Sequence, residues 1–378
     1  MTTEQIAEVR VDLRGRLSHW CETLATVLLF GFALAAPHSI AGSQGGFLAA
    51  AVFWLAGRIL DGRLGLRRTA LDWPLLGLFI WATLSACFSY EPYVSLRGLR
   101  GLAFFSTFYL ITTRACEGLL ARRLAIVLIL SCLVNVTYTI YQKAVGQGLH
   151  IDRMTEQNRL SYIGIQPGDV LISADGRPLT SLTMLSQLVD AGPPNSMIKL
   201  AIRRGEIPLL VELPRRRIQK IKNLTGADRF GVEVSRARDF RAQGFYNHYA
   251  TYAEVLQLIA SLAVGLLLTS PKRIPLLAAL TLAAAALISA LIFTATRAPL
   301  LGLALSVVLM ALTRKGIRRT AVIALILIAL PVGVYLIAKW RGIGLIDTQE
   351  GSTAWRLQVW QEGIKLSLKH PIFGIGKG

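Results

Sequence analysis

Three clusters of polar side chains interrupt an otherwise apolar sequence, and each contains an arginine. Arg297 lies in a short Thr-Ala-Thr-Arg-Ala-Pro turn between two apolar runs. Arg241 opens a segment that also holds His248, an amide and two tyrosines. Arg356 and Trp360 have the spacing of neighbours on one face of a helix. A guanidinium group is planar and permanently charged, so it is well suited to phosphate.

Each cluster also has a structural interpretation. The long side chain of Arg297 can place its charged group at the membrane interface. The tyrosines around His248 can act as interfacial anchors. The helix that carries Arg356 can be an ordinary amphipathic surface helix. Glu254 is the main carboxylate inside a predicted span, where ionisable groups are candidate functional residues. It can also face the interface.

Motifs for several other chemistries are absent from the sequence. It has no HExxH, no G-x-S-x-G and no phosphate-binding P-loop. Its four cysteines form no CxxC pair, and its five histidines are scattered. We therefore predict neither a metal site nor a cofactor.

The composition indicates a membrane protein. Of 378 residues, 53% are apolar and 17% are charged, and the mean hydropathy is +0.50. Soluble proteins carry about a quarter charged residues, so a soluble cytosolic enzyme is not expected. The net charge of +19 could indicate a nucleic-acid partner, but its distribution argues otherwise.

Nine apolar runs are candidate membrane helices, although the second, fourth and eighth are short. They span residues 21–37, 47–60, 73–89, 99–113, 124–141, 250–269, 274–293, 299–312 and 321–338. We expect an α-helical polytopic membrane protein with about nine transmembrane helices.

Among the short connections, the positive charges are concentrated on one side of these runs. They are Arg10, Arg14, Arg16, Arg58, Arg63, Arg67, Arg68, Arg114, Arg122, Arg123, Lys272, Arg273, Arg314, Lys315, Arg318 and Arg319. Basic short loops stay in the cytoplasm, so the N-terminus is predicted to be cytoplasmic. The excess charge is then a topology signal, and no nucleic-acid partner is expected.

A polar island of residues 146–243 separates the fifth and sixth runs. Turn signals flank a predicted strand at 170–173, a helix is predicted at 181–191, and alternating strands at 197–203 and 207–213. The run Gly-Ile-Gln-Pro-Gly-Asp-Val with the elements after it resembles a bacterial PDZ domain over about residues 160–214. The resemblance implies a small α+β fold that binds peptides by β-augmentation. A structural or docking insert remains the alternative.

The membrane part resembles the O-antigen ligase and polymerase family of polytopic membrane glycan transferases. The resemblance is carried by the Arg297 turn, the R-x-x-x-W helix at Arg356, the His370-Pro-Ile-Phe-Gly-Ile-Gly segment and the stretch after Arg241. It implies four regions: 1–145 with about five spans, the PDZ-like insert 146–243, 244–339 with about four spans, and an external segment 340–378.

This resemblance implies transfer of a glycan from an undecaprenyl-diphosphate carrier to lipid A–core or to a polysaccharide, without metal. The location is the periplasmic face of the bacterial inner membrane, where membrane lipids and a peptide partner of the insert are further partners. Arg297, Arg356 and, more weakly, Arg241 are assigned to the diphosphate. His248 is a weak candidate for the general base.

The sequence departs from the family pattern at its end. The family places a catalytic histidine in an H-[NSQ] motif beyond G-x-G, whereas this chain stops at Gly378. We therefore expect a truncated or split reading frame, whose product is incomplete or inactive. A non-catalytic scaffold that presents the PDZ-like domain is the second hypothesis. A transporter is the third, with Asn135 as an intramembrane polar residue but no repeat symmetry.

Overall fold

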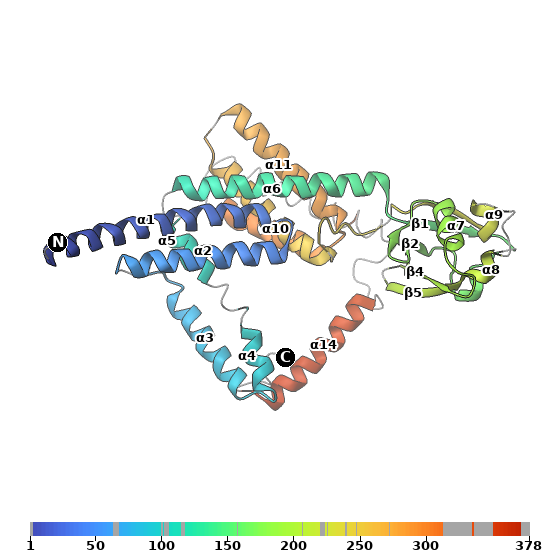
Figure 1. The fold of residues 1–378 in the computed structure, drawn as a ribbon, viewed down its shortest axis with the longest axis horizontal. Helices are drawn as coiled ribbons and strands as arrows, with labels where there is room; N and C mark the ends of the chain where they lie inside the picture. The colour runs from blue at the N-terminus through green and yellow to red at the C-terminus, as the bar shows by residue number, and fades with distance from the viewer. Residues whose placement is uncertain are drawn as a thin grey trace. The chain divides into compact units, whose positions relative to one another are not determined.

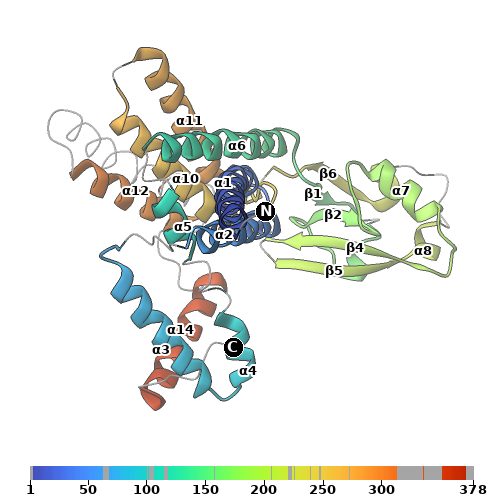
Figure 2. The same cartoon turned by 60° about the vertical axis from the view of Figure 1, so that its left-hand side comes forward.

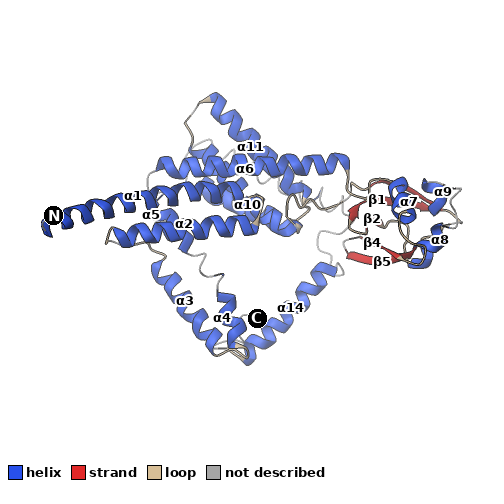
Figure 3. Cartoon of the chain, in the orientation of Figure 1, coloured by secondary structure: helices blue, strands red, loops and turns tan. Residues whose placement is uncertain are grey.

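The computed structural model divides the chain into two compact units. One consists of Met1–Asn135 and Phe245–Gly378, the other of Val136–Gly244. The described residues are 3–62, 68–99, 101, 106–114, 118–156, 158–205, 207–219, 224, 226–238, 240–246, 248–271, 273–312, 335 and 351–371. All described strands belong to the second unit (Figure 3).

The first unit is helical. Its helices are α1 (Thr3–Ala35), α2 (Ile40–Leu60), α3 (Asp72–Cys87), α4 (Pro92–Gly98), α5 (Ser106–Arg114), α10 (Tyr249–Thr269), α11 (Ile274–Phe293), α12 (Arg297–Leu312) and α14 (Gly351–Lys369). Helix α6 (Gly118–Val145) begins in this unit and continues into the second.

Helices α1 and α2 form an antiparallel pair with closely packed backbones (Figure 1). A Cβ atom on Gly46 would lie 3.2 Å from the Cα atom of Phe32, and one on Gly57 would lie 3.3 Å from the Cβ atom of Cys21. The hydroxyl of Ser18 donates a hydrogen bond of 3.0 Å to the carbonyl of Gly57. Small residues and buried hydroxyls of this kind hold helices together in a bilayer, where apolar burial alone favours no partner.

Five described helices are long and apolar enough to cross a membrane: α2, α6, α10, α11 and the Leu13–Ala35 part of α1. Helices α3 and α12 are apolar but have 16 residues each. The predicted fourth span, 99–113, is not one helix in its described part: α4 ends at Gly98 and the nine-residue α5 begins at Ser106. The predicted ninth span, 321–338, lies outside the described residues apart from Tyr335.

The second unit is a small α+β fold, and it includes the end of α6 from Val136. Its strands are β1 (Leu149–Met154), β2 (Val170–Ala174), β3 (Arg177–Pro178), β4 (Met197–Arg204), β5 (Ile207–Pro214) and β6 (Val232–Arg236). Its helices are α7 (Leu182–Asp190), α8 (Arg215–Gln219) and α9 (Gly226–Phe230). The antiparallel sheet has the order β5-β4-β2-β1-β6, with β3 paired to β2 (Figure 2).

Local sequence explains these elements. Strands β4 and β5 pair from Met197 with Pro214 to Arg204 with Ile207, which confirms the predicted hairpin. Asp175 and Gly176 both have positive φ, +46° and +76°, as the tight turn between β2 and β3 requires. Ser181 caps α7 by accepting a hydrogen bond from the amide of Met184. The predicted strand at 170–173 and helix at 181–191 are therefore confirmed.

One ion pair joins the loop before β2 to the end of β4. Arg204 donates from Nε and Nη2 to the two carboxylate oxygens of Asp169, at 2.9 and 2.8 Å. The carboxylate also accepts the amide of Gln166 at 2.9 Å, and Asp169 is 1% exposed. Burial alone would raise the pKa of Asp169, but the hydrogen bonds from Arg204 and Gln166 lower it more, so the net pKa lies below 3.8.

We expect Asp169→Ala to lower the free energy of unfolding of this unit by about 2–3 kcal/mol, because charge-assisted hydrogen bonds are lost. Hydrogen exchange of residues 149–236 in the full chain measures the change. Because the folded pKa is lowered, the stabilisation is present above pH 3.8 and is lost as pH falls further. Asp152→Ala, at an exposed carboxylate, is the matched control; equal effects of the two variants would contradict the assignment.

Candidate functional site

A cavity of about 330 Å³ lies where the α1–α2 connection meets the start of α10. Its lining residues are His38, Ser39, Ile40, Ala41, Phe245, Tyr246, His248 and Thr251. The cavity therefore brings together two of the five histidines, which are separated by 210 residues of sequence.

Asn135 of α6 holds the two walls of this cavity together. Its Nδ2 donates to the carbonyl of Pro37 at 2.6 Å, and its Oδ1 accepts the amide of Phe245 at 3.2 Å. Asn135 is fully buried. A third contact comes from Tyr246, whose hydroxyl donates to the carbonyl of Ala36 at 2.5 Å. Burial raises the pKa of Tyr246 to about 12, so this phenol keeps its proton at neutral pH.

The hydrogen bonds of His38 determine which of its nitrogens carries the proton. Ser131 donates its only hydroxyl proton to the carbonyl of Leu34 at 2.7 Å. It must then accept from Nε2 of His38, which lies 2.8 Å away. The Nδ1 atom of neutral His38 consequently carries a lone pair. Burial lowers the pKa of His38 below 6.5, and the hydrogen bond with Ser131 offsets part of that shift. His38 is therefore a neutral imidazole near pH 7 and a proton acceptor.

The other histidine of the cavity has the opposite tautomer. His248 is the N-cap of α10, and its Nδ1 accepts the amide of Ala250 at 3.2 Å. The proton of neutral His248 is then on Nε2, so this atom is a donor. The ring is exposed and stacks on Tyr249 with centroids 4.4 Å apart. His248, the base candidate from sequence, is thus better arranged to donate a hydrogen bond than to remove a proton.

Arg297 is the first residue of α12, after a buried turn. In that turn Thr294 donates to the carbonyl of Leu291 at 2.7 Å and lies 2.5 Å from the hydroxyl of Thr296. Ala295 is fully buried with φ of +51°, a left-handed conformation that is costly for a residue with a Cβ atom. Such strain persists only where the surroundings fix it, often at functional sites.

The packing of α12 on α10 places Arg297 at the same end of the helices as His248. A Cβ atom on Gly302 would collide with Gln257, and one on Gly265 would lie 3.2 Å from Sδ of Met310. Residue numbers thus increase together along both helices, so α10 and α12 are parallel. Their N-terminal ends, which carry His248 and Arg297, lie on one side.

The structure does not unite all the residues proposed from sequence. Arg241 is half-buried and belongs to the compact unit Val136–Gly244, not to the unit of Arg297. Arg356 lies in α14, and its side chain is outside the described residues. Glu254 is exposed on α10 and does not line the cavity. The assignment of Arg241 and Arg356 to a diphosphate stays a prediction.

A second polar cluster, on β1 and β6, has the residue types of a hydrolase triad but not its connectivity. His150 and Ser235 both contact Oδ1 of Asp152, at 2.8 and 2.9 Å. In a Ser-His-Asp triad the imidazole must lie between the other two groups, whereas here the carboxylate does. Nucleophilic catalysis is therefore not supported there. Within the described ranges, no group of three or more His, Cys, Asp or Glu side chains could hold a metal.

Comparison with known proteins points to one family. Residues 282–378 match the family model described as O-Antigen ligase. This segment runs from within α11 to the end of the chain and contains Arg297 and Arg356. No curated protein matches the chain. The match and the long apolar helices indicate a bacterial membrane protein related to glycan transfer in polysaccharide biosynthesis.

Asn135→Leu removes both hydrogen bonds that join the walls of the cavity. We expect a loss of about 2 kcal/mol or more in stability, because the buried carbonyl of Pro37 loses its donor. Hydrogen exchange at residues 36–41 and 245–251 should increase in the full chain. Ser289→Ala, which removes a hydroxyl bonded only within its own helix, is the control. Unchanged exchange in Asn135→Leu would show that the cavity does not depend on this residue.

Proposed function

We propose that this protein transfers a glycan from a polyprenyl-diphosphate carrier, of the undecaprenyl type, to an acceptor hydroxyl at the membrane surface. The O-Antigen ligase match supports the reaction class. The observation that carries the proposal is that the cationic turn at Arg297 and the cavity with a neutral proton acceptor, His38, lie at the same end of helices α10 and α12. A glycan transferase needs both groups on one side of the membrane.

The chemistry assigns a different task to each group. The acceptor oxygen attacks the anomeric carbon, the bond from that carbon to the diphosphate oxygen breaks, and its electron pair leaves with the diphosphate. Negative charge grows on the leaving group, where Arg297 stabilises it, with Arg356 and Arg241 as further contacts. The proton of the acceptor hydroxyl passes to Nδ1 of His38. His248 donates from Nε2 to an oxygen of either substrate.

The reaction is proposed to take place on the periplasmic face of the inner membrane. The short connections that are rich in Lys and Arg lie on one side of the predicted spans. This distribution favours a cytoplasmic location for that side. Residues 38–46 contain no Lys or Arg, and the α11–α12 turn contains only Arg297. The acceptor, lipid A–core or a polysaccharide, would then approach from the periplasm. The unit Val136–Gly244 would be periplasmic as well.

Arg297→Ala is expected to abolish the activity that the wild-type gene restores to a deletion strain, visible as a changed surface-polysaccharide pattern on a gel. Loss of one charge-stabilising contact costs about 100-fold or more in rate. Arg297→Lys keeps the charge but not the planar fork and should restore activity only in part. The control is Arg273→Ala, in the helix connection at the other end of α11.

The same experiment separates the transferase from the scaffold hypothesis. A deletion strain with an unchanged pattern would contradict glycan transfer. A function that survives Arg297→Ala but is lost in Asp169→Ala would favour a scaffold, because Asp169 stabilises only the unit Val136–Gly244. In that unit β6 is at an edge of the sheet, where an added strand could pair.

His38 predicts the acidic limb of the pH profile. Because burial lowers its pKa, the neutral form persists below pH 6.5, and kcat/KM should fall only as pH drops beneath that value. We expect His38→Gln to lose about 100-fold or more and to flatten the acidic limb. His150→Gln, in the other compact unit, is the control. A limb that persists in His38→Gln and vanishes in His248→Gln would reverse the two roles.

A further inference from the structure

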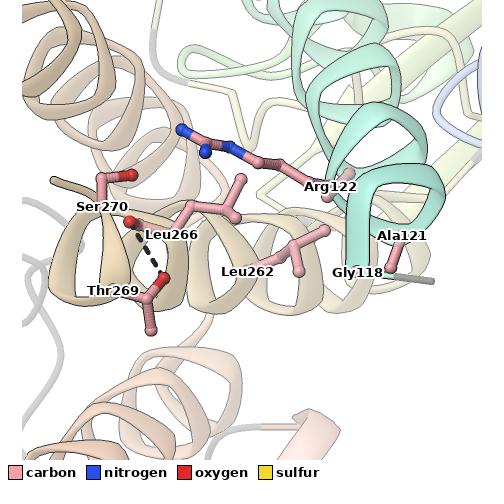
Figure 4. Close-up of a pocket in the computed structure, with 8 residues that line it drawn as sticks. Gly118, Ala121, Arg122, Leu262, Leu266, Thr269 and Ser270 are labelled. Atoms are coloured by element: carbon pink, nitrogen blue, oxygen red, sulfur yellow. Dashed lines mark hydrogen bonds between the residues drawn. The ribbon is translucent and has the colours of Figure 1, made fainter. Parts of the chain in front are cut away.

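A second cavity, of about 320 Å³, lies at the opposite end of α10 (Figure 4). It is formed by the start of α6 and the last turns of α10. Its lining residues are Gly118, Ala121, Arg122, Ala125, Leu262, Leu266, Thr269 and Ser270. Since α10 has 21 residues, the two cavities are separated by about 30 Å, the thickness of the bilayer core.

Arg122 is the cation of this cavity. Its side chain extends from α6 across the cavity, so that the guanidinium lies above Leu266 on the side of Ser270 (Figure 4). Arg122 is half-buried and makes no hydrogen bond or ion pair with another residue in the part of the chain that the structure describes. A half-buried guanidinium is costly unless an anion or water satisfies its donors.

Two hydroxyl groups lie in the cavity with Arg122, those of Thr269 and Ser270, and they differ in whether they already have a hydrogen-bond partner. Thr269 donates to the carbonyls of Gly265 and Leu266 within α10. Ser270, which is only 7% exposed, has no hydrogen bond from its hydroxyl to any described group. This hydroxyl, on the wall of the cavity, is therefore available to donate to a ligand.

The remaining walls are apolar. Leu262 and Leu266 face Ala121 and Ala125 across the cavity. A soluble phosphate ion would satisfy Arg122 and leave these walls uncovered, whereas a phospholipid presents both a phosphate and a glycerol-linked acyl chain. Both helices are long and apolar enough to cross a membrane, which places the cavity at a membrane interface.

We propose that this cavity binds the phosphate headgroup of an anionic membrane phospholipid, held by Arg122 and Ser270. The lipid lies in the leaflet opposite the His38–His248 cavity and bridges α6 and α10. Basic pockets between membrane helices on the cytoplasmic side are suited to anionic headgroups. This site is independent of the glycan-transfer reaction.

The test uses the full chain in mild detergent with phosphatidylglycerol, phosphatidylethanolamine or inorganic phosphate, followed by native mass spectrometry and thermal unfolding. Phosphatidylglycerol should bind and raise the unfolding midpoint as its concentration increases. Arg122→Gln should weaken this binding by about tenfold or more, and Ser270→Ala by less. Arg123→Gln is the matched control, because this adjacent arginine is exposed and does not line the cavity.

The outcomes are decisive in both directions. Equal affinity for phosphatidylglycerol and phosphatidylethanolamine, or equal loss in Arg122→Gln and Arg123→Gln, would overturn the proposal. Inorganic phosphate that competes fully with the lipid would also overturn it in favour of a soluble anion. If Arg122→Gln does not fold, Arg122→Lys replaces it. Because this variant keeps the charge but not the fork, retained folding with weakened lipid binding would support the site, and unchanged binding would contradict it.

Discussion

The end of the helical unit that carries the His38–His248 cavity depends on the side chain of Asn135. Inside or beside a bilayer, water cannot satisfy backbone groups, so every break in a helix needs a partner from the protein. Asn135 supplies one to the carbonyl of Pro37 and one to the amide of Phe245. It therefore holds together two non-helical segments, one after α1 and one before α10, whose bonded residues are 208 positions apart in the sequence. The residues next to these bonded positions, His38 and Tyr246, line the cavity.

The same helix face then sets the protonation state of the cavity. Ser131 lies four residues before Asn135 on α6, so both side chains point to the same side. Asn135 positions the backbone of the α1–α2 connection through its bond to Pro37. Ser131 then orients the imidazole of His38, the next residue of that connection. Two ordinary polar residues of one apolar helix thus determine where His38 can accept a proton. A reactive group of this kind can be built without a metal ligand set or a strong ion pair.

The sequence predicts local features well and long-range juxtaposition poorly. The β4–β5 hairpin, helix α7 and the five long apolar helices follow from periodicity and turn residues. Strands β1 and β6 were not predicted, because their partners lie far away along the chain. In the sequence, Asn135 is only a polar residue in an apolar run, and His38 is only one of five scattered histidines. Their roles arise from packing between α1, α6 and the segment before α10, which periodicity cannot reveal.

The distribution of charge along the chain distinguishes Arg297 from the arginines of the basic connections. A net charge of +19 would attract any anion if it were spread over both faces. Sixteen of the 41 Lys and Arg residues lie in the short connections that, in the proposed topology, face the cytoplasm and orient the chain. The short connections 38–46 and 294–297 contain no Lys or Arg other than Arg297, whose field is strong where it lies close to a low-dielectric region. The strained, buried backbone at Ala295 holds this charge at the start of α12. An arginine that served only to orient the chain would not need this strained backbone.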